Sequence, residues 1–313
     1  MKIFITGGLG LIGSHIAEML LTRGDEVLVI DNLATGRSEH LTKHPRLEIL
    51  IDTIANKDLV YSLVKKFKPD TVIHAACSYK DPDDWYNDTL TNCVGGCNIV
   101  DASKHYGVQR FIYFQTALCY GLKPQEQPIT LNHPLNPGYS SYAISKTANE
   151  HYINLSGIDY VTFRLANVIG PRCVAGPVPV FYQRLKDEKQ CFVTNSRRDF
   201  VFVKDLAKTV LQACDGTGHG TYHFSSGKDI AIKELYDSVV NAMGLKNYPE
   251  PKTCELGSNE VYSILLDPSR TIADFGEIEF TPIETTVAEA IDYYHKYGTL
   301  GEYTHFRLEE KKS

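Results

Sequence analysis

Short apolar runs alternate with helical patterns through the first half of the chain. In the first helical stretch, Ile12, Ile16, Met19 and Leu20 recur at spacings of four, three and one residues, which places them on one helix face. The apolar runs are rich in Val, Ile, Phe and Tyr, as is typical of strands that are buried on both faces. We predict strands at Lys2–Thr6, Glu26–Ile30, Leu47–Leu50, Thr71–His74, Arg110–Phe114 and Tyr160–Leu165.

This alternation predicts an α/β fold, with a doubly wound parallel sheet, helices on both faces and right-handed crossovers. The pattern changes after about residue 166, where Gly170-Pro171, Gly176-Pro177 and Pro179 indicate irregular chain. Later elements are predicted as strands at Asp199–Val203 and Thr221–Phe224, and as helices at Val203–Ala213, Ile232–Met243, Pro268–Phe275 and Thr285–Tyr297.

A glycine-rich turn follows the first predicted strand and opens the first predicted helix. Its glycines, Gly7, Gly10 and Gly13, have the spacing GxxGxxG. The first permits a tight turn, the second lets the backbone approach a pyrophosphate, and the third allows close packing of helix on strand. The helix N-terminus faces the anion, so Leu11 and Ile12 are expected among the cofactor contacts.

Asp31 ends the second predicted strand, at the distance from the turn where a dinucleotide-binding fold places an acidic residue. A carboxylate there accepts hydrogen bonds from the adenosine ribose hydroxyls and repels a 2′-phosphate. NAD is therefore favoured over NADP, although Arg37 lies nearby. The strand–helix pattern and the glycine turn together predict a Rossmann-type NAD-binding domain over residues 1–165, to which 199–226 return, and a smaller C-terminal substrate-binding lobe formed by 166–198 and 227–313.

Tyr142 and Lys146 form a YxxxK pair, and positions i and i+4 share one helix face. An ammonium group beside a phenol lowers the tyrosine pKa. The tyrosinate can then remove a proton from a sugar hydroxyl as hydride leaves for a nicotinamide. Thr116 ends the fifth strand, where such sheets bind ligands, and can hold the same oxygen. Taken alone, the Tyr142/Lys146 pair would fit a solvated helix face, and Thr116 would fit a strand-end cap. Because the glycine turn occurs in the same chain, a catalytic role for these residues is favoured.

The chain resembles the extended short-chain dehydrogenase/reductase family, and within it the nucleotide-sugar epimerases and dehydratases, over nearly its whole length. The matching segments are the glycine turn, Asp31-Asn32, His74-Ala75-Ala76, Asn92, Thr116 before Tyr120-Gly121, the Tyr142/Lys146 pair, Arg164–Asn167, Gly170-Pro171-Arg172 and Arg198–Ala207. Through Tyr79–Trp85 and Phe114–Gly121 it is similar to O-antigen and capsule-sugar 4-epimerases and to a 4-dehydrogenase acting on GDP-linked manno-heptose.

The resemblance implies roles for further residues. Arg198 would hold the nucleotide diphosphate, and Asn167 would meet the sugar-phosphate end. Lys80 matches a lysine that approaches the cofactor pyrophosphate. The remaining cofactor contacts that it implies are Asn32, Thr53, Ile54, Ala75, Ala76 and Asn92.

The implied activity is NAD-dependent oxidation at C4 of a UDP- or GDP-linked hexose or heptose, for surface polysaccharide biosynthesis. The product would be the 4-epimer or the 4-keto sugar. Three positions depart from the family pattern. Ala117-Leu118 replaces the Asp-Glu pair of 4,6-dehydratases, Thr53 replaces an acidic residue near the adenine, and Glu255–Glu260 lacks a second diphosphate-binding arginine. A 4-ketoreductase, a 4,6-dehydratase and a non-catalytic NAD-binding regulator are the alternatives.

The composition of the chain limits the classes of binding partner and the compartment that we expect. A net charge of -6 argues against nucleic acid or an anionic membrane surface, which require clustered Lys and Arg. We expect a cytoplasmic protein, because no signal peptide or membrane-spanning apolar run occurs. The eight cysteines contain no CxxC pair, so no metal site is expected. In relatives, segments matching Trp85–His105 and Ser141–Leu155 pair across a homodimer, which we expect here too.

Overall fold

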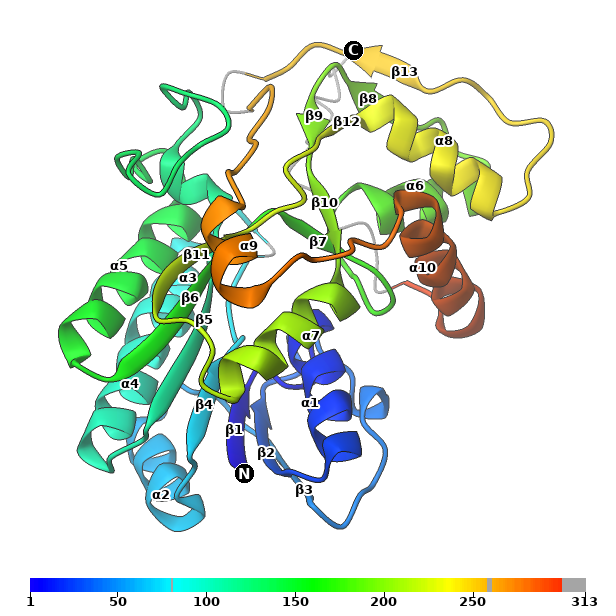
Figure 1. Ribbon diagram of the computed structural model, residues 1–313. Helices are drawn as coiled ribbons and strands as arrows, with labels where there is room; N and C mark the ends of the chain where they lie inside the picture. The colour runs from blue at the N-terminus through cyan, green and yellow to red at the C-terminus, as the bar shows by residue number, and fades with distance from the viewer. Residues whose placement is uncertain (80, 258–260, 300–313) are drawn as a thin grey trace.

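The structure is a computed structural model that describes residues 1–79, 81–257 and 261–299. Its centre is a seven-stranded sheet with the order β11-β6-β5-β4-β1-β2-β3, in which all neighbouring strands are parallel (Figure 1). This confirms the predicted Rossmann-type α/β fold. The strands are β1 (Lys2–Thr6), β2 (Glu26–Asp31), β3 (Leu47–Ile51), β4 (Thr71–His74), β5 (Arg110–Thr116), β6 (Asp159–Leu165) and β11 (Gly220–Phe224).

Helices cover both faces of the sheet because successive strand residues point to opposite sides. In β1, Ile3 and Ile5 belong to one buried cluster and Phe4 to another. The first cluster is covered by α1 (Leu11–Arg23) and α7 (Val203–Cys214). The second is covered by α2 (Lys57–Phe67), α4 (Gly96–His105) and α5 (Ser141–Ser156).

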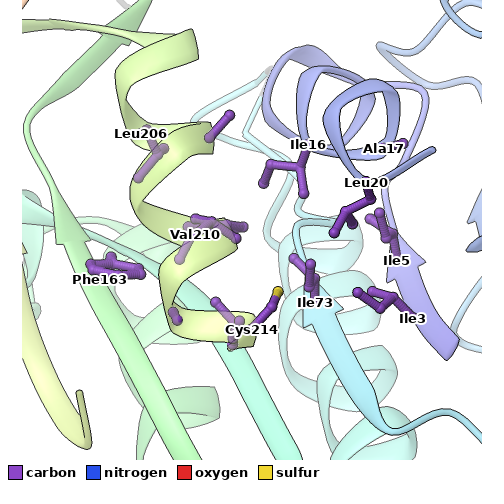
Figure 2. Close-up of a cluster of buried hydrophobic side chains, with 14 of the residues drawn as sticks. Ile3, Ile5, Ile16, Ala17, Leu20, Ile73, Phe163, Leu206, Val210 and Cys214 are labelled. Carbon is purple, nitrogen blue, oxygen red and sulfur yellow. The ribbon is translucent and has the colours of Figure 1, made fainter. Parts of the chain in front are cut away.

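Figure 2 shows the first of these layers, in which α1 and α7 share the sheet face. Leu20 of α1 and Val210 of α7 are fully buried over Ile5 and Ile73. Burying one such side chain contributes about 1.5–3 kcal/mol to folding. The layer therefore depends on α7, which enters the sequence nearly two hundred residues after α1.

Beyond the sheet, a second core forms between α6 (Pro177–Lys186), α8 (Ile232–Ala242) and α10 (Ile283–Tyr297). Three two-stranded sheets accompany it: β7 (Asn167–Ile169) with β10 (Phe200–Phe202), β8 (Phe192–Thr194) with β13 (Lys252–Cys254), and β9 (Arg197–Arg198) with β12 (Ile230–Ala231). The helix α9 (Ser269–Phe275) lies beside β11. The division into two domains stays a prediction.

One sequence-based expectation is corrected. The chain after Gly170 is not irregular throughout, because α6 begins at Pro177. Proline suits the first helical turn, where its missing N–H has no partner to lose. The segment Trp85–His105 is helical throughout, and it consists of α3 (Trp85–Asp88), the π-helical segment η2 (Thr89–Gly95) and α4. The described residues also include two short 3-10 helices, η1 (Ser38–His40) and η3 (Ala117–Tyr120).

The strand order places the candidate site. From β1 the chain moves outward to β2 and β3, then returns to β4 on the other side of β1. The connections therefore diverge between β1 and β4. Ligands of open α/β sheets bind at this point, beyond the carboxyl ends of the strands.

Three buried histidines predict a loss of stability in acid. Burial lowers the pKa of His15 and His74 from 6.5 to about 3, and that of His223 to about 4. Below pH 6.5 the unfolded chain therefore binds protons that the folded chain does not. The free energy of unfolding should be greatest above pH 6.5 and fall toward pH 4, by up to about 1.4 kcal/mol per pH unit for each histidine.

Urea denaturation at a series of pH values measures this effect. Burial raises the pKa of Asp31 and Asp199, and these two carboxyl groups offset part of the loss at the acid end. The free energy of unfolding should therefore change most steeply with pH between about pH 6 and pH 5, just below the ordinary histidine pKa of about 6.5. A free energy of unfolding that stays constant over this interval would contradict the prediction.

Candidate active site

A cavity of about 450 Å³ lies at the carboxyl ends of the strands. On one side of β1 it is lined by residues that follow β2 and β3, and on the other by residues that end or follow β4, β5 and β6. The structure brings most of the predicted site residues together there. Those lining it are Gly7, Gly10, Leu11, Ile12, Gly13, Asp31, Asn32, Thr53, Ile54, Ala75, Ala76, Thr116, Tyr142 and Lys146.

The glycine turn fits closely under the cavity. Gly7 has φ +67°, and a Cβ there would lie 2.6 Å from the Ala76 nitrogen. A Cβ at Gly13 would overlap the Gly7 carbonyl oxygen. By contrast, a Cβ at Gly10 would meet only that same oxygen, at 3.4 Å, so its outer side is open. The turn therefore has the shape expected of a cradle that admits a dinucleotide against the N-terminus of α1.

Asp31 ends β2 and faces the cavity with an ordered carboxylate. Its Oδ2 accepts a hydrogen bond from the Leu9 N–H (2.9 Å), and its Oδ1 accepts one from the Leu33 N–H (2.8 Å). Burial raises the pKa of Asp31, and these two hydrogen bonds oppose the shift. Each carboxylate oxygen has a further lone pair, which can accept a ribose hydroxyl.

Tyr142 and Lys146 lie in the first turns of α5, whose N-cap residue Ser140 accepts a hydrogen bond from the Ala143 N–H (3.4 Å). Tyr142 is partly accessible through the cavity and Lys146 is buried. The Lys146 Nζ lies 4.3 Å from the centroid of the Tyr113 ring. The helix thus presents both groups to the cavity.

The predicted lowering of the tyrosine pKa is wrong for the protein chain by itself. Burial raises the pKa of Tyr142 well above its ordinary value, and it lowers the pKa of Lys146. Desolvation opposes the charged form of both groups, so a lysine that is itself buried does not compensate for it. The cationic nicotinamide ring of bound NAD would have to offset the effect of burial on the phenol.

Thr116 ends β5, and its Oγ1 accepts a hydrogen bond from the Leu118 N–H (3.1 Å). It therefore caps η3 and lines the cavity at the same time. A hydroxyl that accepts one hydrogen bond can still donate its own proton. The two interpretations of this residue are compatible.

Asn92 does not line the cavity. Its side chain is buried in η2, where Oδ1 accepts from the Ser78 N–H (2.9 Å) and Nδ2 donates to the Ser78 carbonyl (3.1 Å) and the Ser145 Oγ (3.0 Å). It therefore fixes Ser78, which does line the cavity. Direct contact between Asn92 and the cofactor stays a prediction. Lys80 lies outside the described residues.

Asn167 and Arg198 also lie outside the cavity lining, in β7 and β9. The Asn167 Nδ2 donates to the Asp199 carbonyl (3.0 Å), and the Arg198 Nη1 donates to the carbonyls of Arg197 (2.8 Å) and Tyr262 (3.0 Å). The charge of Arg198 opposes the rise that burial causes in the pKa of Tyr139. Their contact with substrate stays a prediction.

Several lining residues were not predicted from the sequence. Tyr79, which begins one of the segments that carry the family resemblance, lies in the cavity wall. The available signal was position alone, because many of the others end or closely follow strands of the main sheet. The further lining residues are Ile30, Ala34, Thr35, Asp52, Cys77, Ser78, Asp81, Asp84, Asn87, Thr91, Phe114, Gln115, Leu165, Ala166, Val168, Cys173 and Ala175.

Comparison with known proteins identifies the class. Residues 3–223 match the model of the NAD dependent epimerase/dehydratase family. This match spans more than half of the chain, and the protein therefore belongs to that family. The family is NAD-dependent, and the glycine cradle and Asp31 fit that cofactor. The expected resemblance is confirmed.

Particular relatives carry the comparison further. The structure of WbmH from Bordetella bronchiseptica with NAD+ is 64% identical in sequence, covers 95% of this chain and 99% of that one, and has a TM-score of 0.94. WbmG of the same organism, with NAD and UDP, is 38% identical over 98% of this chain and 99% of its own, with a TM-score of 0.89. A putative UDP-glucose 4-epimerase of Methanocaldococcus jannaschii is 31% identical over 85% of this chain and 89% of its own.

Proposed function

We propose that this protein uses NAD to oxidise the C4 hydroxyl of a nucleotide-sugar, giving the 4-epimer or the 4-keto product. One observation carries the proposal: Tyr142, Lys146 and Thr116 line the same cavity as the glycine turn and Asp31. A non-catalytic NAD-binding protein has no need of these three groups at the far end of a cofactor cavity.

The residues have distinct roles in this proposal. Tyr142 takes the proton from the C4 oxygen, and Thr116 holds that oxygen by a hydrogen bond. Lys146 provides positive charge behind the phenol. When bound, NAD supplies the acceptor for the hydride that leaves C4. Thr116 and Tyr142 come from β5 and α5, so two separate elements fix the substrate oxygen.

We favour UDP as the nucleotide, because the WbmG structure, 38% identical in sequence, contains UDP beside NAD. GDP is the alternative. The sugar would be a hexose or heptose destined for a surface polysaccharide, as the resemblance to O-antigen and capsule enzymes implies. Elimination of water is not expected, since Ala117 and Leu118 supply no acid or base after Thr116.

The test is a product analysis. The purified protein would be denatured to identify its nicotinamide, and fresh protein would be incubated with hexoses and heptoses linked to UDP, GDP and dTDP. NMR spectra should show inversion or oxidation at C4. A product lighter by one water would indicate a dehydratase, and no change with any sugar would contradict the proposal. NADP in place of NAD would contradict the role of Asp31.

Replacing Arg198 with alanine should raise the Michaelis constant for the nucleotide-sugar by about ten-fold or more. A charged hydrogen bond to phosphate contributes about 1.5–3 kcal/mol. Binding of NAD should stay unchanged. Steady-state kinetics at saturating NAD measures the effect.

Arg197→Gln is the matched control for this variant. Arg197 precedes Arg198 in β9, but its side chain is paired with Asp229 (2.8 Å). A raised Michaelis constant in the Arg197 variant, together with a normal one in Arg198→Ala, would contradict the prediction, because it would show that Arg197 and not Arg198 holds the diphosphate.

We also propose a homodimer formed through the helical segments Trp85–His105, which comprises α3, η2 and α4, and Ser141–Leu155 of α5. These helices pack together and expose an apolar surface, with Trp85 at 68%, Tyr86 at 74% and Leu155 at 77% of their full accessibility. Such a surface favours a partner over water. Sedimentation equilibrium tests it, with Leu155→Glu as the variant that should yield monomers.

A cytoplasmic location is proposed on separate grounds. All eight cysteines are free thiols, as expected in a reducing compartment. Within the described residues, no helix is long and apolar enough to cross a membrane.

A further inference from the structure

Leu9, in the middle of the glycine turn, is held at both of its peptide groups. Its N–H donates to the Oδ2 of Asp31 (2.9 Å), which lines the cavity. Its carbonyl accepts from the His40 ring Nδ1 (2.7 Å), and at longer range from the Arg37 N–H (3.3 Å). Leu9 is fully buried, so no solvent replaces either bond. The orientation of the turn therefore depends on His40, a residue that does not line the cavity.

His40 makes a second hydrogen bond on its other side. Its Nε2 lies 2.8 Å from the Tyr293 hydroxyl, and the two rings pack edge to face with centroids 6.0 Å apart. Because the Leu9 carbonyl can only accept, the hydrogen must be on Nδ1. In the neutral imidazole, Nε2 then accepts from Tyr293. Burial lowers the pKa of His40, which favours this neutral form.

Tyr293 belongs to α10, which packs in the second core with α6 and α8. A second hydrogen bond connects the same two segments: the Arg37 Nη1 donates to the Tyr297 carbonyl (3.0 Å). The end of α10 is thus attached to the segment between β2 and β3. Hydrogen bonds run from the second core, through His40, to the backbone that faces the cofactor.

We propose that His40 and Tyr293 are positioning residues that hold the glycine turn in its binding conformation from outside the cavity. Retention of NAD then depends on the docking of α10. The inference goes beyond the proposed function, because it concerns cofactor binding and holds whichever sugar is the substrate.

The experiment measures release of the reduced cofactor from the full-length protein. NADH-loaded protein is mixed with excess NAD, and the loss of bound NADH fluorescence gives the dissociation rate. Tyr293→Phe should raise this rate about three-fold or more, and His40→Leu about ten-fold or more, as loss of one or two buried hydrogen bonds implies. His40→Gln, whose amide can both donate and accept, should restore much of the wild-type rate.

Coupling is tested by combining the changes. His40→Leu with Tyr293→Phe should release NADH no faster than His40→Leu alone, because the tyrosine acts through the histidine. Asp292→Asn, a change at an exposed position of the same helix, should leave the rate unchanged. Thermal unfolding without cofactor identifies variants that are folded at the assay temperature.

Two results would overturn the proposal. One is a His40→Leu protein that is less stable but releases NADH at the wild-type rate, which would make His40 merely structural. The other is a double variant whose effects multiply, which would remove the link between Tyr293 and the turn. Failure to find a sugar substrate would affect neither result.

Discussion

Tyr142→Phe should lower turnover by about 10²–10⁴-fold, the usual loss when a general acid or base is removed. The substitution keeps the ring that packs at the start of α5 and removes only the oxygen that accepts the proton. NAD and the nucleotide-sugar should still bind, so the loss should appear in kcat. Single-turnover measurement of NADH formation at 340 nm separates this step from product release.

The pH profile gives an independent measure. Activity should rise with pH as the base loses its proton, because burial raises the pKa of Tyr142. Lys146→Met should shift this rise to higher pH, since it removes the nearby positive charge. Thr116→Val should lower turnover less than Tyr142→Phe does and leave the profile in place. Near-normal turnover in Tyr142→Phe would refute the catalytic assignment.

Arg164→Met should destabilise the fold by about 3–5 kcal/mol, as expected when one partner of a buried ion pair is removed. Arg164 lies 2.7 Å from Glu150, and their side chains are 9% and 2% accessible. The Arg164 Nη1 also donates to the Tyr120 hydroxyl (2.6 Å). Burial alone would lower the pKa of Arg164, but the charge of Glu150 and its hydrogen bond, with further contributions from Cys119 and Tyr120, together outweigh this effect and raise the pKa.

Urea denaturation of three variants tests the energetic origin. Lys204→Met breaks the accessible pair with Glu289 and should cost less than about 1 kcal/mol. Arg164→Met combined with Glu150→Leu should recover part of the loss, because no buried charge is then left without its partner. If Arg164→Met were as stable as the wild type, the prediction would be wrong, because buried Glu150 would then be accommodated without the arginine.

The main sheet could be predicted from the sequence because its strands are buried on both faces. Each first-half run, such as Glu26–Ile30, was placed within one or two residues of the observed strand. The sequence does not predict the helix α6, because Pro177 and Pro179 also indicate irregular chain. Their position in the first turn, where proline is tolerated, becomes visible only once the start of the helix is known.

The site could be predicted where function depends on local spacing. The glycine turn and the Tyr142/Lys146 pair are short motifs, and both line the cavity. The direction of the tyrosine pKa could not be predicted, since it depends on burial by distant segments. His40 and Tyr293 are 253 residues apart, and no local pattern connects them.

The order in which the chain is made has a consequence for the layer formed by α1 and α7. A nascent chain that has emerged from the ribosome as far as β6 already contains six of the strands in the central sheet, but not the helix that shares one face with α1. Ile5, Ile73 and Phe163 would then lack the apolar partners Leu206 and Val210. Exposed surfaces of this kind bind chaperones or aggregate. Synthesis should therefore pass through a vulnerable interval that ends only when residues beyond Cys214 are free.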